Sequence, residues 1–301
     1  MSAAEVGVEA GDGVGAGVGR GADREALRDL RVDRFARLVG PAAIERLRAA
    51  HVTVVGVGGV GSFVVEALAR SGVGHLTLID GELISATNLN RQLHALETTL
   101  GRPKVEVMAE RLRALDRALD VTAIHGRYDE SAAARLIPEP ASGVVDLVVD
   151  AIDNVTAKLH LIARCHALRL PIVSCMGAAG RLDPTQIMVG DLCETKQDHF
   201  ARDVRKFLRR RHGIDCKKPT GIFAVWSREP GQKALSFESD AASGIPDVSP
   251  DVPGIRGPRC QASAVFVTAA MGMAAASLVV RELTKAEAAP AVPAPAAAGE
   301  A

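Results

Sequence analysis

Short apolar runs alternate with amphipathic segments through the middle of the chain. The apolar runs predict strands at residues 51–55, 75–79, 121–124, 145–149 and 172–174. Apolar residues recur at helical spacing just after residue 61, from 103 to 115 and from 155 to 169. Because strands alternate with helices, we expect an α/β, Rossmann-like fold whose mainly parallel sheet carries helices on both faces.

Three stretches break this pattern. Residues 1–30 are rich in Gly and Ala, residues 227–259 are rich in Pro without a clear period, and residues 285–301 hold nine Ala and three Pro. These compositions predict a disordered N-terminal arm, a mobile loop and a disordered tail. Residues 31–284 would then form one domain with a C-terminal extension.

The uncharged segment 262–280 is close in length to a membrane-spanning helix. Its many Ala, Ser, Thr and Gly residues keep its hydrophobicity modest, which favours a buried helix over a span. We expect no stable membrane insertion, while peripheral association with the inner membrane stays open.

Charge balance and cysteine spacing narrow the class of protein. The 36 Lys and Arg residues match 36 Asp and Glu residues, which disfavours broad nonspecific binding to nucleic acid. Apolar residues make up 48% of the chain, so a wholly disordered protein is excluded. The five cysteines form no C-x-x-C pair, which disfavours a disulfide framework and a zinc site and fits a cytoplasmic location.

A glycine-rich loop, Gly56-x-Gly58-x-x-Gly61, follows the first predicted strand and opens a helix. Its backbone N–H groups can approach phosphates at the helix N-terminus. Asp80 ends the next strand nineteen residues later and can accept hydrogen bonds from ribose hydroxyls. The pattern predicts a nucleotide site, and it is typical of proteins that bind NAD or FAD.

Charged residues near this loop favour a triphosphate over a dinucleotide. Arg91 lies in the run Asn88–Gln92, and Lys104 begins the following helix, where a cation calls for an anionic partner. Asp153 and Asn154 follow a later strand, at the sheet edge where ligands bind in open α/β folds. Such a set suits ATP with Mg²⁺, because charge builds on the leaving pyrophosphate. Taken singly, each residue could instead be a surface ion pair or a turn cap.

The motifs follow one another in a distinctive order: GVGGVGS at 56–62, ID at 79–80, NLNRQ at 88–92, GRPKVE at 101–106 and DAIDN at 150–154. In this order, over about residues 31–195, the chain resembles the ThiF/MoeB-type adenylating enzymes, relatives of the ubiquitin-activating enzymes. The resemblance implies a ThiF-type domain that binds ATP through Gly56, Gly58, Gly59, Gly61, Asp80, Asn88, Arg91, Gln92, Lys104, Asp153 and Asn154. Asp80 would hold the ribose. Asn88, Arg91 and Lys104 would grip the phosphates, and Asp153 would carry Mg²⁺.

The same resemblance implies a homodimer and a reaction. Arg34-Phe35-Ala36-Arg37 is similar to an N-terminal element that reaches into the neighbouring subunit's ATP site, which would make Arg37 a catalytic arginine acting in trans. Arg91, Lys104 and Asp153 would complete the catalytic set. Enzymes of this family join a carboxylate to the α-phosphate of ATP, giving an acyl-adenylate and pyrophosphate.

Two further segments resemble one branch of the family. GAAGRLDPTQI at 177–187 and VWSREP at 225–230 are similar to the tRNA threonylcarbamoyladenosine dehydratases. These enzymes activate a threonyl carboxylate on a modified adenosine of tRNA, and ring closure then expels AMP. Without C-x-x-C pairs, the alternative of activating a sulfur-carrier protein's C-terminus is less favoured. A cysteine desulfurase or other sulfur-transfer partner and a bound monovalent cation stay open, and no zinc is expected.

A basic segment fits an RNA substrate. Residues 202–211 contain six basic residues and one acidic residue, with Val204, Phe207 and Leu208 on one helical face. The candidates for contacts with the RNA backbone are Arg205, Lys206, Arg209, Arg210, Lys217 and Lys218. The alternative is a solvated helix face.

The sequence is also compatible with other functions. Cys216 lies beside Lys217 and Lys218, which could lower its pKa, yet dehydration needs no thioester because an internal nucleophile closes the ring. An NAD-binding oxidoreductase would prefer NAD to ATP. A non-catalytic adaptor would tolerate Asp153→Ala and Arg91→Ala.

Overall fold

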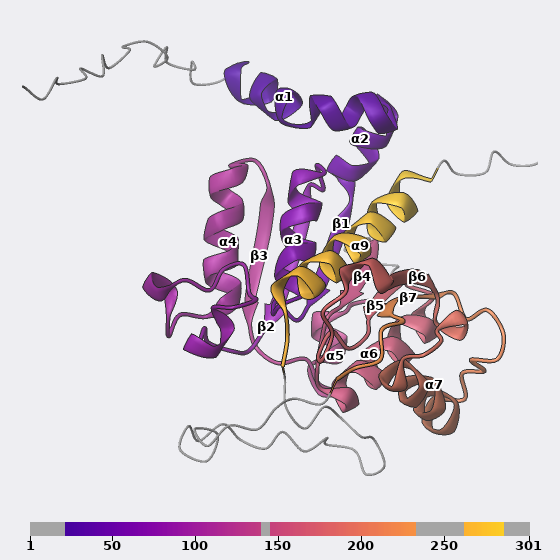
Figure 1. The fold of residues 1–301 in the computed structure, drawn as a ribbon. Coiled ribbons are helices and arrows are strands. Elements are labelled where there is room, and N and C mark those ends of the chain that lie inside the picture. Colours follow the sequence, from indigo (N-terminus) through magenta and orange to yellow (C-terminus); the bar gives the residue numbers. More distant parts are fainter. Residues whose placement is uncertain (1–21, 140–144, 233–261, 286–301) are drawn as a thin grey trace, which may run out of the picture.

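A seven-stranded sheet forms the centre of the computed structural model, which describes residues 22–139, 145–232 and 262–285. The strand order is β3-β2-β1-β4-β5-β7-β6. The strands are β1 (His51–Val55), β2 (His75–Asp80), β3 (Asp120–His125), β4 (Leu147–Asp150), β5 (Ile172–Cys175), β6 (Ile187–Asp191) and β7 (Ile222–Ser227). All neighbouring pairs run parallel except β6 and β7, which are antiparallel. The predicted mainly parallel α/β sheet is confirmed (Figure 1).

Helices cover both faces of the sheet. One core packs α3 (Gly61–Arg70), α4 (Lys104–Leu115) and α9 (Val265–Thr284) against the strands. The other contains α5 (Ala133–Leu136), α6 (Val155–Leu168) and α7 (His199–His212). Successive side chains of a strand point to opposite faces. Accordingly Leu147 and Val149 of β4 belong to the first core and Val148 to the second.

Two helices precede the sheet, α1 (Ala22–Val39) and α2 (Pro41–Ala49). The predicted disordered arm is wrong for residues 22–30, which belong to α1, while residues 1–21 lie outside the described residues. Arg31 ties α1 to the body, because its guanidinium donates to Ala69 O at 2.6 Å and to Asp116 Oδ2 at 2.7 Å. Gly40 adopts φ 87°, which lets the chain turn sharply from α1 into α2.

The other predicted boundaries are tested only in part. Ser227 is the last residue of β7, and residues 228–232 are described, whereas the rest of the expected mobile loop lies outside the described residues. In the expected tail only Lys285 is described. Strands β6 and β7 are not among the predicted strands, although their residues overlap the segments 177–187 and 225–230 that resemble one branch of the family.

Helix α9 lies across α3 in Figure 1 and packs on α2, α3 and the strands β5, β6 and β7. Its length and composition would suffice to cross a membrane, and half of its most apolar stretch is buried inside the fold. A Cβ on Gly272 would lie 2.7 Å from Phe63 Cβ and 2.7 Å from Val60 O. The small residues that lower its hydrophobicity thus allow close packing, as a core helix requires.

Candidate active site

The glycine-rich loop links β1 to α3 at the carboxyl edge of the sheet. Gly56 adopts φ 91°, and a Cβ there would lie 2.6 Å from the Ala151 carbonyl oxygen. A Cβ on Gly61 would collide with the Gly56 carbonyl oxygen. Only glycine satisfies both positions, so the loop lies tightly against the Ala151 segment with its backbone close to the start of α3.

Asp80 ends β2 and fastens the glycine-rich loop. One carboxylate oxygen accepts a hydrogen bond from Val57 N at 2.8 Å, and the other accepts one from Glu82 N at 2.8 Å. Burial raises the pKa of the Asp80 carboxyl above its usual value, and the nearby Lys104 ammonium opposes this shift. Asp80 therefore lies at the loop, as predicted, and its visible partners are backbone N–H groups.

Lys104, the first residue of α4, is buried, and its ammonium lies 2.5 Å from the carboxylate of Glu82. Beside it, His94 is 2% exposed, and neither ring nitrogen has a hydrogen-bond partner among the described residues. Burial, helped by the Lys104 charge, lowers the pKa of His94 to about 4. This low pKa favours a neutral ring at pH 7 and so disfavours His94 as a phosphate-binding cation.

Arg91 and Asp153 lie within electrostatic reach of each other. Burial lowers the pKa of the Arg91 guanidinium, while the charges of Asp153 and Glu82 raise it. The guanidinium donates to Thr87 O at 2.7 Å, and its aliphatic stem lies 3.4 Å from where a Gly59 Cβ would be. Arg91, Asp153 and the glycine-rich loop are thus brought together, as the sequence predicts.

Two of the predicted nucleotide ligands, Asn88 and Asn154, have structural partners, and a third, Gln92, lies beside the loop. Asn88 is buried and accepts a hydrogen bond from Ser85 N at 3.1 Å, which caps a short 3₁₀ turn. Asn154 caps α6 by accepting from Ala157 N at 2.8 Å. Gln92 Nε2 lies beside the loop, 3.8 Å from a Cβ built on Gly58, and its buried Oε1 has no partner in the described part of the chain. Asn88 and Asn154 therefore shape the site's loops.

A buried ion pair supports the Asp153 loop, and sequence analysis missed it. Lys158 and Asp150 are both 0% exposed, with the ammonium 2.6 Å from Asp150 Oδ2. Lys158 also donates to Cys175 O at 2.9 Å, and Ser174 Oγ donates to the same Asp150 oxygen at 2.6 Å. A charged residue inside the apolar period of 155–169 is the sequence signal that could have revealed it.

The two segments that resemble one branch of the family lie side by side. The Glu229 carboxylate accepts hydrogen bonds from Leu182 N at 3.0 Å and Asp183 N at 2.8 Å. Buried Arg181 donates to Glu229 O at 3.0 Å and pairs at 2.9 Å with Asp198, the N-cap of α7. Arg181 therefore joins both segments to α7, a link that the linear sequence does not show.

The basic segment forms α7, as predicted, with Val204, Phe207 and Leu208 buried. Arg205 is committed to the protein, because it donates to Thr195 O at 2.8 Å. Cys216 is buried, and burial raises the pKa of its thiol, although the charges of Arg205 and Arg209 lower it. A reactive Cys216 thiolate is therefore disfavoured.

Comparison with known proteins gives this architecture a family. A model of the ThiF family matches residues 32–294. The chain belongs to the ThiF family. Among relatives, it is 43% identical over 202 residues to the tRNA threonylcarbamoyladenosine dehydratase of Haemophilus influenzae, covering 66% of this chain and 76% of that protein.

Two further members of the ThiF family give context. The structure of Escherichia coli tRNA N6-threonylcarbamoyladenosine dehydratase in complex with ATP has a TM-score of 0.71 and 36% identity, covering 85% of this chain and 94% of that chain. Molybdopterin-synthase adenylyltransferase of Escherichia coli is 38% identical over 139 residues, 46% of this chain and 53% of that protein. The dehydratase similarity thus extends over more of the chain.

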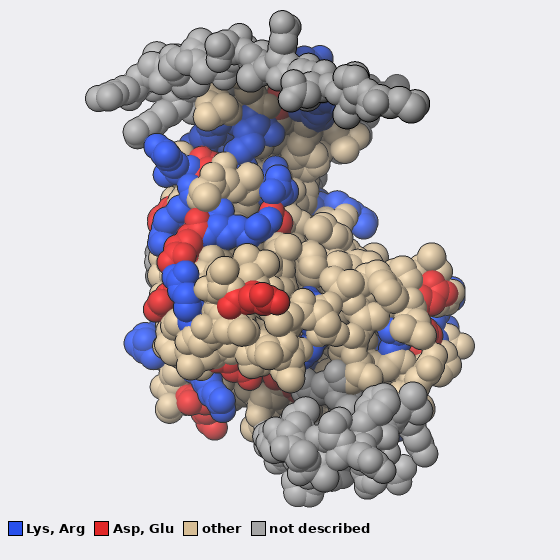
Figure 2. All heavy atoms as spheres, turned by 60° about the vertical axis from the view of Figure 1, so that its left-hand side comes forward, with Lys and Arg blue, Asp and Glu red and all other residues tan. Residues whose placement is uncertain are grey.

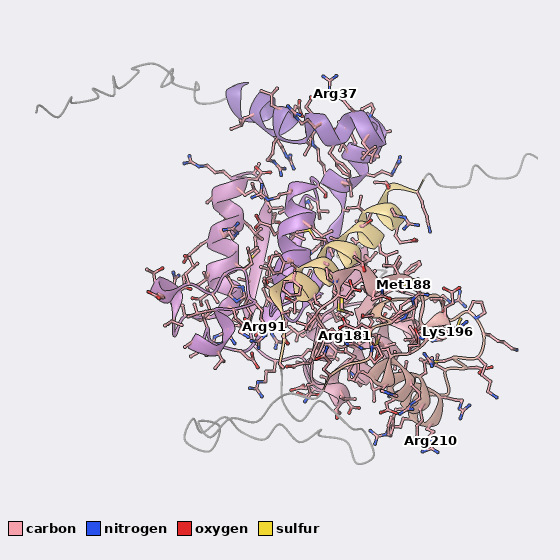
Figure 3. All side chains as sticks on the ribbon, in the orientation of Figure 1. Arg37, Arg91, Arg181, Met188, Lys196 and Arg210 are labelled. Carbon is pink, nitrogen blue, oxygen red and sulfur yellow. The ribbon has the colours of Figure 1, made fainter. Side chains whose placement is uncertain are left out.

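Arg37, which the family resemblance places in a neighbouring site, lies far from this chain's own ThiF-type site. Figure 3 shows Arg37 on α1 at one end of the molecule, well away from Arg91. The Arg37 side chain is 77% exposed and pairs with Asp33 on its own helix at 2.9 Å. A single chain therefore does not bring Arg37 to Arg91.

The residues at the ThiF-type site fit ATP and Mg²⁺. The glycine-rich loop admits close approach to its backbone, and Gln92 offers a buried acceptor without a partner among the described residues. Asp153 is exposed, and Mg²⁺ commonly binds one or two carboxylates together with substrate phosphates. Over residues 22–139, 145–232 and 262–285, no three His, Cys, Asp or Glu side chains gather to hold a metal ion by themselves.

Proposed function

We propose that this chain is an ATP-dependent tRNA threonylcarbamoyladenosine dehydratase. The observation that carries the proposal is the convergence of Arg91, Asp153 and buried Lys104 around a glycine-rich loop. The structure of an ATP-bound dehydratase matches this chain over 85% of its length. The same enzyme has also been solved with AMP, the nucleotide that ring closure would release.

The reaction has two chemical steps. A carboxylate oxygen of the threonyl group attacks the α-phosphorus of ATP, and the bond to pyrophosphate breaks. A nucleophile within the modified base then attacks the activated carbonyl carbon, a ring closes, and AMP leaves with the former carboxylate oxygen. The net change in the tRNA is the loss of one water, driven by cleavage of ATP.

The chain's own residues supply charge and position. Arg91 and Lys104 neutralise the charge that grows on the leaving pyrophosphate. In a site that excludes water, each such contact lowers the activation free energy by about 3 kcal/mol. Asp153 would hold Mg²⁺, which supplies further neutralisation of phosphate oxygens when bound. Asp80 keeps the loop backbone pointed at the nucleotide through its bond to Val57 N.

We infer that the active form is a homodimer. Arg37 lies well away from the site of its own chain (Figure 3). Helix α1 also exposes the apolar side chains of Leu27, Leu30 and Leu38. Apolar side chains exposed on a projecting helix favour burial against another surface. In a dimer, Arg37 of one chain would add positive charge to the phosphates bound by its partner. A cytoplasmic location and a sulfur-transfer partner stay predictions.

The proposal is tested with tRNA that carries threonylcarbamoyladenosine. The purified chain, ATP, Mg²⁺ and this tRNA are incubated, and the nucleosides are weighed after digestion. We expect a nucleoside lighter by one water, with AMP and pyrophosphate formed in equal amounts. An unchanged nucleoside would contradict the proposal. Pyrophosphate exchange that needs a Gly-Gly-tailed protein instead of tRNA would favour sulfur-carrier activation.

A further inference from the structure

A concave basic surface lies between α7 and the turn that follows it. Its volume is about 190 Å³. The residues that line it are Arg202, Arg205, Lys206, Arg209, Cys216 and Lys217. Five of these six side chains are cationic, and no carboxylate lines the surface. We call it the basic cavity.

The walls of the basic cavity are held by hydrogen bonds. Arg205 links α7 to the preceding loop through Thr195 O. Outside the lining, the Asp191 carboxylate accepts hydrogen bonds from Thr220 N and Gly221 N, both at 2.8 Å. These contacts hold both chain segments that flank Cys216 and Lys217. Hydrogen bonds to the backbone therefore fix the two segments that carry the cations relative to each other.

Charge at the basic cavity is only partly balanced, because Asp191 and Asp215 lie near Cys216 but form no ion pair with a lining cation among the described residues. On the α4 side of the molecule, basic and acidic side chains intermingle (Figure 2), as when Arg111 and Arg70 pair with Glu66. Within the described residues Lys206, Arg209 and Lys217 form no ion pair, and Arg202 reaches only Asp203, at 3.7 Å. Cations that outnumber their acidic partners repel one another, so an anion from outside would be bound favourably.

We propose that the basic cavity binds phosphodiester groups of the tRNA backbone. The choice of tRNA as the partner rests on the proposed function. The choice of phosphate groups as the contacts rests on the charge and shape of the cavity. Phe207, the aromatic residue of α7 nearest these cations, is 6% exposed and covered by Lys206 and Arg211. Without an exposed ring at this surface, bases have nothing to stack on, so the contacts are to phosphates and independent of sequence.

This proposal divides the residues that the sequence marks as RNA contacts. Lys206, Arg209 and Lys217 line the basic cavity, and Arg202 joins them. Arg205 lines it too, but one of its nitrogens is already bonded to Thr195. Arg210 is exposed near the end of α7 (Figure 3) and is outside the lining. Lys218 is also exposed and outside the lining. Spacing in the sequence could not separate these groups, because part of the lining comes from Cys216 and Lys217, which follow α7.

Two double variants of the full chain test the proposal. Arg209→Ala with Lys217→Ala removes two charges from the basic cavity. Lys196→Ala with Arg211→Ala removes two exposed charges from the same region outside its lining. Binding of fluorescent unmodified tRNA is measured by anisotropy over a range of salt concentrations. Binding of a fluorescent ATP analogue checks that each variant keeps the nucleotide site.

We expect the cavity variant to bind tRNA several-fold more weakly and to lower the slope of log affinity against log salt by about 2. The control should change that slope by clearly less. Equal effects of both variants, or none, would overturn the proposal. If the cavity variant loses binding of inorganic pyrophosphate in calorimetry but keeps its tRNA affinity, the cavity takes small anions and the RNA assignment is wrong.

Failure of the proposed function would look different. If the wild-type chain leaves the modified nucleoside unchanged while the cavity variant still binds tRNA more weakly than the control, the dehydratase proposal fails and the cavity stands. If the wild type dehydrates its substrate and both variants match it in affinity and salt slope, only the cavity proposal fails.

Discussion

At the scale of single residues, the candidate site rests on buried ionisable groups that solvent does not reach. Asp150 and Lys158 form an ion pair beneath the Asp153 loop. Ala151, the residue after Asp150, lies against Gly56. His94 stays neutral against Lys104. Each arrangement is favourable only while its partners stay in place, so these residues have the sharpest mutational consequences.

Lys158→Met should destabilise the fold strongly. It leaves the Asp150 carboxylate, which is 0% exposed, without its cation. Removing one partner of a buried pair costs about 3–5 kcal/mol of unfolding free energy. The control is Lys285→Met, which breaks a pair with Glu282 whose Lys side chain is 64% exposed and should cost under about 1 kcal/mol. Urea denaturation compares them, and equal small losses would refute the account.

His94 should make the fold sensitive to acid. Its pKa falls from 6.5 to about 4 on folding. Between these values only the unfolded state is protonated, so stability is full above pH 6.5 and falls as pH drops toward 4, by on the order of 3 kcal/mol. His94→Leu should remove this part of the decline, while exposed His166→Leu should not. Unfolding free energy measured from pH 7 to pH 4 checks this; parallel curves for wild type and His94→Leu would contradict it.

At the scale of elements, helix α9 shows how packing uses small residues. It packs across α3 and also reaches the glycine-rich loop, because a Cβ on Gly272 would lie 2.7 Å from Val60 O. Asn90 adds a second link, donating to Ser263 O just before α9 at 3.0 Å. The helix thus supports the candidate site from behind as well as filling the core.

Gly272→Ala separates packing from helix propensity. Propensity alone would stabilise a helix by up to about 1 kcal/mol when Ala replaces Gly. Here the added methyl meets a backbone oxygen and Phe63, so we expect a net loss of about 1–3 kcal/mol. Met273→Ala, on the exposed side of the same helix, should change stability little. Thermal and urea unfolding measure both, and a stabilised Gly272→Ala would show that α9 is not closely packed.

Elements with a strong local signal were predictable from the sequence. The order β1, glycine-rich loop, α3 and β2 is confirmed, because apolar runs and glycine spacing encode it directly. Helix α1 was missed over residues 22–30, since its first turns follow a Gly-rich stretch and carry alternating charges. The antiparallel pairing of β6 with β7 and the Arg181 link depend on residues distant in sequence.

The candidate site was predictable to a similar degree. Arg91, Lys104 and Asp153 gather at the sheet edge because strand order places their loops together. The capping contacts of Asn88 and Asn154 and the buried Lys158 pair could not be read from motifs. A motif specifies residue types in order, whereas a cap or a buried partner is decided by which backbone group lies within about 3 Å.

At the scale of the whole molecule, the proposed role of Arg37 in a neighbouring site needs a second chain. Arg37, on α1 at one end of the molecule, lies well away from Arg91 of the same chain (Figure 3). A symmetric dimer whose projecting α1 helices cross could place each Arg37 at the partner's site. Action of Arg37 in trans can therefore be tested by mixing two variant chains.

Mixing two inactive variants should restore activity. Arg37→Ala lacks the arginine supplied to the partner, and Asp153→Ala lacks the carboxylate of its own site. In a mixed dimer the Arg37→Ala chain keeps Asp153 and receives an intact Arg37, so equal mixing should recover about a quarter of wild-type sites. Dehydration is assayed after the chains have exchanged. Recovery no greater than the average of the two variants would refute action in trans.

The most direct measurement follows the oxygen that leaves the tRNA. The threonyl carboxylate of the substrate is labelled with heavy oxygen, and AMP formed in a single turnover is weighed. If the carboxylate attacks the α-phosphorus, AMP should carry one labelled oxygen while the cyclised nucleoside loses it. Label in inorganic phosphate with formation of ADP, or unlabelled AMP, would contradict the account.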